Sequence, residues 1–212
     1  MKISVITCTT PGRSVAFDLC RKYVERQTLQ PHQWIIMDDA DTPMPTKVLQ
    51  ALSQVTGDAI AFIEDDDWEA PDYLEWVEDS LNRGYDIVGE GEAIYYHVAR
   101  RWWSNCRNVR HASLCQTAIR TTMLEKLVNV ITAWDNPFFD CRLWRCDANK
   151  FLHLPRESLR RCIGIKGMPG TPGYSPEHRQ KDPDGSNLDP SLLKLWKLIG
   201  QDATAYAPFY LK

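Results

Sequence analysis

A short apolar run that ends in a cluster of acids constrains the fold of this chain more than any other stretch. Residues 59–63 (AIAFI) are followed at once by Glu64, Asp65, Asp66 and Asp67. A continuous apolar run of this length is typical of a strand buried on both faces of a parallel sheet. Adjacent carboxylates at its end repel one another and lose hydration, so they lower stability unless a cation neutralises them.

A second pair of acids, Asp38 and Asp39, follows the apolar residues 33–37 (QWIIM). Because the carboxyl ends of parallel strands meet at one edge of a sheet, we expect both acid groups at the same place. Carboxylate oxygens suit Mg²⁺ or Mn²⁺, which predicts a divalent-cation site at this edge. For either cluster alone, the alternative is a solvated acidic turn beside a helix.

Strands and helices are predicted to alternate through the first part of the chain. Strands are expected at residues 3–7, 33–37, 59–63 and 85–88, and helices at 14–27, 46–55 and 71–81. This alternation is typical of an α/β fold with a mostly parallel central sheet flanked by helices.

After residue 91 the pattern changes toward a smaller antiparallel part. Strands are expected at 93–103, 114–119 and 150–154, and helices at 122–130, 135–146 and 192–199. Residues 162–174 (CIGIKGMPGTPGY) contain four glycines and two prolines, which favours a loop. No stretch has the composition of a linker, so we expect a single domain over residues 1–212.

Charge is unevenly distributed along the 212 residues, whose formal net charge is −3. Residues 41–92 contain fourteen acids and two bases, whereas residues 97–166 contain thirteen bases and five acids. An acidic part beside a basic part suggests a metal site and a separate surface for an anion. Seven scattered cysteines favour reduced thiols, and neither a signal peptide nor a membrane-spanning run is evident. We therefore expect a cytoplasmic location, in the host if the chain is viral.

Three motifs together carry a family resemblance: ISVITCTTPGR (3–13), QWIIMDDAD (33–41) and AIAFIEDDDWEAPDYLE (59–75). With weaker similarity in SLCQTAIRTTML and FFDCRLWR, residues 1–145 resemble the family 2 glycosyltransferases of the GT-A fold. The resemblance implies a GT-A-like, Rossmann-like fold in which residues 1–92 bind a nucleotide sugar and residues 93–212 bind the acceptor. It also implies a uridine diphosphate (UDP) sugar donor, with glucose as the expected sugar, a hydroxyl acceptor, Mn²⁺ or Mg²⁺ as cofactor, and inversion at the sugar.

The resemblance also implies donor-binding roles for residues at the sheet edge. Thr9 would lie against the nucleoside, and Asp39 would accept a hydrogen bond from the nucleobase. Asp65 would lie near the ribose and the metal, Asp67 would bind the metal, and Asp66 could share either role.

Four further side chains are candidates near the donor. Lys47 falls roughly where the family carries a basic residue, but the segment TPMPTKVLQALSQVTG is shorter than in the family, which leaves that role open. Lys166 could close over the donor with its glycine-rich stretch as a lid, or belong to an ordered turn that binds nothing. His178 could complete the metal shell and Arg179 could bind the diphosphate, although a single surface histidine more often does neither.

An inverting transfer needs a carboxylate that takes the proton of the acceptor hydroxyl. By resemblance, Asp140 in FFDCRLWR matches this base best, and Asp135 is the second candidate. The alternatives are a helix cap for Asp135 and a first-turn acid favoured by the helix dipole for Asp140.

The basic part of the chain suggests an acceptor. Arginines and tryptophans adjoin in RRWW (100–103), and more arginines follow as far as Arg161. Cations beside stacking surfaces suit nucleic acid, so double-stranded DNA with hydroxymethylated pyrimidine bases is one expected partner. Alternatively, these arginines bind the donor diphosphate or pair with the acidic part, and the acceptor is a glycan or small molecule. A nucleotidyltransferase and a non-catalytic binding module are the remaining hypotheses.

Overall fold

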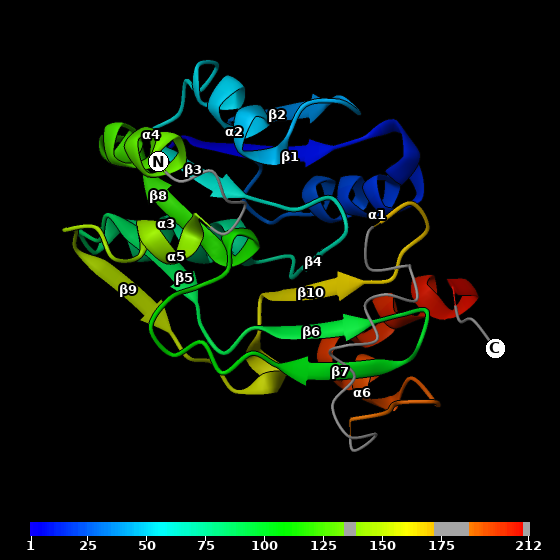
Figure 1. Cartoon of the computed structure of the whole chain (residues 1–212). Helices are drawn as coiled ribbons and strands as arrows, with labels where there is room; N and C mark the ends of the chain where they lie inside the picture. Colours follow the sequence, from blue (N-terminus) through cyan, green and yellow to red (C-terminus); the bar gives the residue numbers. More distant parts are fainter. Residues whose placement is uncertain (134–138, 172–186, 210–212) are drawn as a thin grey trace.

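A six-stranded sheet forms the centre of the protein in the computed structural model, which describes residues 1–133, 139–171 and 187–209 (Figure 1). Its strands, in spatial order, are β2 (Gln33–Asp38), β1 (Ile3–Thr9), β3 (Ala59–Phe62), β8 (Thr117–Arg120), β5 (Ile87–Glu90) and β9 (Lys150–His153). Only β8 among them runs antiparallel to its neighbours. The expected mostly parallel central sheet is confirmed.

Helices cover both faces of this sheet because successive strand residues point to opposite sides. One face packs its apolar side chains against α1 (Ser14–Glu25) and α3 (Tyr73–Asn82). The other packs against α2 (Met44–Leu52), α4 (Leu124–Thr132) and the single turn α5 (Asp140–Leu143). The four inner strands β1, β3, β8 and β5 are therefore buried on both sides, whereas the edge strands β2 and β9 are partly exposed.

A second, four-stranded sheet adjoins the first (Figure 1). Its order is β4 (Trp68–Glu69), β10 (Cys162–Lys166), β6 (Ile94–His97) and β7 (Trp102–Asn105). It packs against α6 (Leu193–Ile199) and the 3₁₀ segment Gly200–Phe209. Shorter 3₁₀ turns lie at Pro11–Arg13, Leu114–Gln116, Thr121–Met123 and Glu157–Leu159.

The predicted loop at residues 162–174 was wrong for its first part, because Cys162–Lys166 is the inner strand β10. Ile163 and Ile165 are fully buried and alternate along the strand. Gly164 is needed there for close approach, since a Cβ atom would lie 2.3 Å from the ring of Tyr95 on β6. Glycine therefore marks tight strand packing at this position, whereas its abundance suggested a loop.

Two other predicted elements differ in extent. The strand predicted at 93–103 is the antiparallel pair β6–β7, joined by a turn in which Arg101 has a φ of +52°. The helix predicted at 135–146 is described only from residue 139 onward, where α5 is four residues long. Within the described ranges, no helix is long and apolar enough to span a bilayer.

Candidate active site

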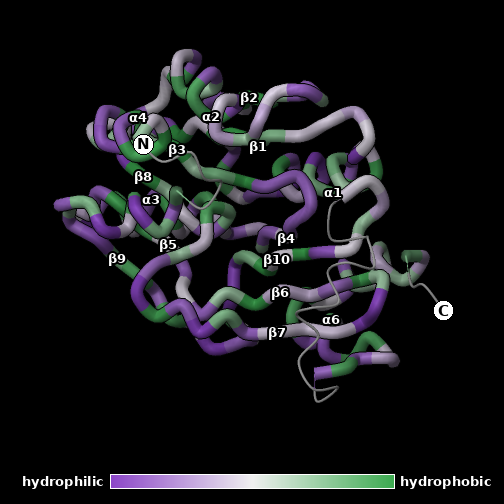
Figure 2. Tube along the Cα trace, in the orientation of Figure 1, coloured by the Kyte–Doolittle hydropathy of each residue, from purple (hydrophilic) through white to green (hydrophobic). Residues whose placement is uncertain are grey.

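The acids that follow β3 lie in the interior of the protein and not on a solvated turn. Asp65, Asp66 and Asp67 are only 1%, 6% and 1% exposed to solvent. Figure 2 shows this hydrophilic loop running from the apolar strand β3 toward β4. Oδ1 of Asp67 accepts a hydrogen bond from the backbone N–H of Ile165 at 2.9 Å, so strand β10 fixes the end of the acidic loop.

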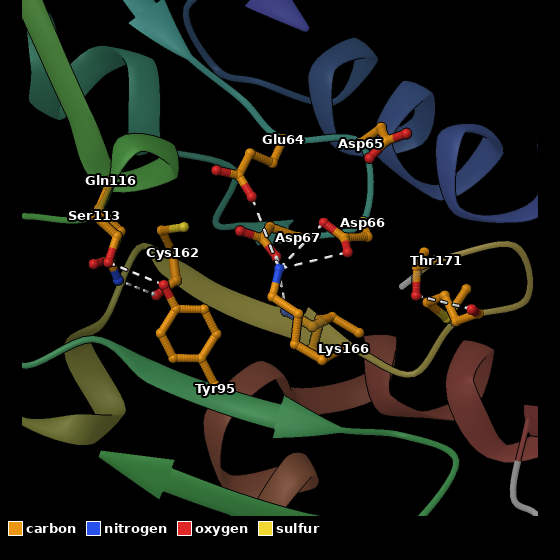
Figure 3. Close-up of polar contacts among 12 residues, drawn as sticks. Glu64, Asp65, Asp66, Asp67, Tyr95, Ser113, Gln116, Cys162, Lys166 and Thr171 are labelled. Carbon is orange, nitrogen blue, oxygen red and sulfur yellow. Dashed lines mark hydrogen bonds and ion pairs between the residues drawn. The ribbon is translucent and has the colours of Figure 1, made fainter. Parts of the chain in front are cut away.

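Two cations partly offset the charge of this acidic cluster (Glu64, Asp65, Asp66 and Asp67). Nη2 of Arg13 lies 2.7 Å from Oδ1 of Asp65 and 3.0 Å from Oδ2 of Asp66. Nζ of Lys166 lies 3.1 Å from Asp67, 3.4 Å from Asp66 and 3.8 Å from Glu64. Figure 3 shows the Lys166 ammonium pointing between these three carboxylates. Lys166 therefore belongs to strand β10 and to the acidic cluster, not to a loop.

Burial dominates the acid–base behaviour of the cluster. It raises the pKa of Asp65 to about 6, although the Arg13 charge acts in the opposite direction. Burial also raises the pKa of Asp67, with Lys166 opposing it. For Lys166 desolvation lowers the pKa, but the charges of Asp66 and Asp67 outweigh it and leave that pKa raised. These directions follow from placing several like charges in a poorly hydrated space.

The cluster offers a suitable ligand set for a divalent cation. Oxygen atoms of Glu64, Asp66 and Asp67 lie within 4.8 Å of one another, and hard oxygen ligands suit Mg²⁺ or Mn²⁺. The Lys166 ammonium stands among the same three carboxylates. An ion can use this set only when Lys166 moves aside. Asp67 also belongs to a second group of potential ligand atoms, together with Cys115 and Cys162, and all three residues are buried.

Thr9, Asp39 and Lys47, which the sequence predicts beside the nucleotide, are brought together at the ends of β1 and β2. Nζ of the buried Lys47 donates to the backbone oxygen of Thr9 at 2.6 Å and to that of Asp39. The Asp39 carboxylate accepts hydrogen bonds from the Thr42 hydroxyl and from the Asp41 N–H, which lower its pKa. Lys47 thus ties the two strand ends together through backbone carbonyls.

A small hollow of about 110 Å³ lies beside the first part of the acidic cluster, between β1, β3 and α2. Apolar side chains from β1, β3 and α2 form its floor, and Arg13, Glu64 and Asp65 provide its polar wall. Leu114, from the segment that precedes β8, closes another side. The predicted nucleoside-binding residues approach the cluster at another point: β1 and β3 are parallel neighbours, and Thr9, at the end of β1, is close enough to Asp65 to act on its pKa.

Asp140 is the first residue of α5 and is 8% exposed. Burial raises its pKa, and the charge of His111 acts against this shift. Oδ1 of Asp140 is buried with no hydrogen-bond partner among the described residues. His111 begins the segment that continues to Leu114 in the small hollow. The other predicted site residues, Asp135, His178 and Arg179, lie outside the described residues.

Sequence reasoning missed three charged residues of this region. Arg13 follows the Pro-Gly pair after β1 and ends the motif ISVITCTTPGR, in which it had no assigned role. Glu64 was not assigned a role, yet it belongs to the potential ligand set. Glu69 is fully buried on β4 near the cluster, and burial raises its pKa well above the ordinary value, with the charges of Asp67 and Glu64 acting in the same direction. The sequence offered one signal for Glu69: it lies two residues after Asp67, and in an extended segment this spacing directs two side chains to the same side.

Structure comparison identifies the fold. No known protein family matches the chain by sequence, and no curated protein matches it. The structure is similar to that of S. aureus TarS 1-349 in complex with UDP-GlcNAc, with a TM-score of 0.52, 14% identity and coverage of 78% of this chain and 59% of that one. The chain has a GT-A-like fold. It spans about three fifths of the length of that TarS fragment.

A second solved structure is similar to this chain. This is the glycosyltransferase involved in glycosylation of the major capsid of PBCV-1, with a TM-score of 0.51 and 10% identity. The alignment covers 73% of this chain and 82% of that one. At such low identities the likeness concerns the architecture, and any activity must be argued from the residues of this chain.

Proposed function

We propose that this protein is a glycosyltransferase that moves a sugar, with glucose as the first candidate, from a UDP-sugar to a hydroxyl group. The observation that carries the proposal is that the acidic cluster lies at the same edge of a GT-A-like sheet as Thr9, Lys47 and Asp39. Ligands of open α/β sheets bind at this edge. A protein with a similar structure was solved in complex with UDP-GlcNAc.

The donor would bind across this edge. Asp39 would accept a hydrogen bond from the uracil ring, with Thr9 against the nucleoside. Asp65, held by Arg13, would face the ribose. Asp67, with Glu64 and Asp66, would hold Mn²⁺ or Mg²⁺, and the bound ion would neutralise charge on the diphosphate leaving group.

Asp140 is the proposed base for the acceptor proton, and Asp135 remains the second candidate. A buried carboxylate with a raised pKa and an oxygen free to accept a proton suits this task. Such a group removes a proton more effectively than a solvated carboxylate when its pKa approaches the working pH.

DNA with hydroxymethylated bases is the proposed acceptor, with a glycan or a small molecule as the alternative. Some of the basic residues are used within the protein. Arg161 pairs with Asp72 and Glu90, and the buried Arg160 donates to the backbone oxygen of Gly91 at 2.9 Å. The arginines that can meet an external anion are therefore fewer than the sequence suggests.

Calorimetry with nucleotides tests the donor assignment. UDP should bind in the millimolar range or tighter, which is the usual scale for substrates. The change Asp39→Ala should weaken UDP binding, because it removes the acceptor for the base. The neighbouring exposed Asp38→Ala is the matched control and should bind like the wild type. Binding of guanosine diphosphate in place of UDP would contradict the assignment.

A further inference from the structure

A second hollow, of about 470 Å³, lies apart from the acidic edge and is strongly basic. One part of its wall is the segment 107–111, which follows β7. The other part is formed by Cys141 in α5 and by Arg145, two residues beyond the end of α5. We call it the arginine hollow, and it is lined by Arg107, Asn108, Val109, Arg110, His111, Cys141 and Arg145. Three guanidinium groups thus converge from two parts of the chain on one concave surface.

The three arginines of this hollow are not neutralised within the described part of the chain. Arg107, Arg110 and Arg145 are exposed and form no ion pair there. Arg161, by contrast, has acidic partners. Several like charges gathered without counter-ions repel one another, so their placement favours an external anion.

The segment that bears two of these arginines is held in a defined shape. The Asn105 side chain accepts a hydrogen bond from the Arg107 N–H at 2.7 Å. The Asn108 side chain accepts from the Ala93 N–H at 2.7 Å and donates to the His111 carbonyl at 3.0 Å. Arg107 adopts a φ of +52°, a conformation that costs about 1–3 kcal/mol and persists where surrounding contacts enforce it. The hollow is therefore organised before any ligand arrives.

The arginine hollow adjoins the proposed base. Cys141 lines the hollow and directly follows Asp140 in α5. Its Sγ lies 3.4 Å from Nε2 of His111, on the opposite wall. From His111 the chain continues to Leu114, which lines the small hollow of about 110 Å³ beside the acidic cluster. One short segment therefore connects the arginine hollow with the region proposed for the donor.

We propose that the arginine hollow binds a phosphate group of the acceptor, an inference that rests on the proposed glycosyl transfer. Guanidinium groups bind phosphate through paired, charge-assisted hydrogen bonds, and three of them suit a multiply charged oxyanion. The volume exceeds that of a single phosphate and leaves room for the group attached to it. The bound phosphate would position the neighbouring hydroxyl of the acceptor for Asp140.

The test measures phosphate binding by titration calorimetry on the full chain with saturating UDP and Mg²⁺, so that the donor region is filled. The probes are glycerol 3-phosphate, uncharged glycerol and a short DNA duplex. Arg107→Gln, Arg110→Gln and Arg145→Gln each remove one guanidinium. Arg83→Gln is the matched control, because Arg83 is also exposed and basic but lies outside both the hollow and the basic part of the chain. Melting curves and UDP binding on the same samples verify the fold.

We expect glycerol 3-phosphate to bind the wild type and the control alike, about tenfold or more weakly to each hollow variant, and glycerol not at all. If only the duplex binds, and it loses affinity in the same three variants, the phosphate belongs to DNA and the hollow is still its site. Equal affinity of all four variants for both probes, or no binding of either to the wild type, overturns the proposal.

Two further measurements, UDP binding and the slow hydrolysis of UDP-sugars, distinguish the phosphate site from the proposed glycosyl transfer. Their absence, with phosphate still bound in the hollow, would refute the glycosyl transfer and keep the anion site. Their presence, without phosphate binding, would refute the hollow alone.

Discussion

Nζ of Lys166 lies 3.1 Å from Oδ1 of Asp67, and the same oxygen accepts the N–H of Ile165. Two adjacent residues of β10 thus supply a cation and a backbone donor to one carboxylate. The ammonium occupies the space between the carboxylates that form the potential metal ligand set. A divalent ion and the lysine therefore compete for the same oxygens.

Replacement of this lysine should strengthen metal binding. In Lys166→Met the carboxylates lose their competing cation, so Mn²⁺ should bind at least about tenfold more tightly, since one close ion pair in a partly buried site is worth a few kcal/mol. Electron paramagnetic resonance of free Mn²⁺ measures this directly. Lys22→Met, at an exposed position of α1, is the control. Equal affinities in both variants would show that the ion binds elsewhere.

Removal of the metal or of its main ligand should stop transfer. Asp67→Asn keeps an oxygen that can accept from Ile165, so the fold should persist while transfer falls about a hundredfold or more. Excess EDTA should silence the wild type, and added Mn²⁺ should restore it. The exposed Asp79→Asn should behave like the wild type. If the enzyme kept full activity in EDTA, no metal ion would be needed, and Arg13 and Lys166 would be the groups that neutralise the charge on the diphosphate.

Loss of the proposed base should affect turnover and not donor binding. Asp140→Asn should lower kcat by about two to four orders of magnitude, with UDP affinity unchanged. In the wild type, transfer should decline as the pH falls through the raised pKa of Asp140, because only the ionised carboxylate accepts a proton. If Asp135→Asn shows this behaviour and Asp140→Asn does not, the base lies earlier in the chain.

The buried Asp65 should make stability depend on pH. Its pKa is about 6 in the folded protein against an ordinary value of 3.8, so the folded state binds more protons between these values. The free energy of unfolding should therefore fall as the pH rises from 4 to 6, by on the order of 2 kcal/mol from this group. Urea unfolding of metal-free protein measures the slope. In Asp65→Asn the slope should be flatter, and an unchanged slope would exclude Asp65 as its source.

Much of the fold could be predicted from the sequence because its central strands are continuous apolar runs with acids at their ends. The run at 59–63 predicted both a buried strand and the position of Asp65, Asp66 and Asp67. Thr9 and Asp39 could be placed at the same edge because parallel strands align their carboxyl ends. These features are local or follow from one simple topology.

The parts of the fold and of the site that could not be predicted depend on contacts between segments that are distant in the sequence. Strand β10 was mistaken for a loop because Gly164 is required by Tyr95, a partner that no local pattern reveals. The pairing of Lys166 with the acids then followed from β10 lying beside β4. The arginine hollow likewise unites Arg107 and Arg145, which lie in different parts of the chain.

Gly170 follows β10 and lies directly on the backbone of Gly12, where an added Cβ atom would come within 1.9 Å of the Gly12 oxygen. Arg13 is next to Gly12, and Lys166 is four residues before Gly170. Arg13 and Lys166, whose cations face the acidic cluster, thus lie close to a point where two segments of the chain touch backbone to backbone. Any larger side chain at position 170 would push these two segments apart, so the placing of both cations beside the acids depends on the smallest residue near them.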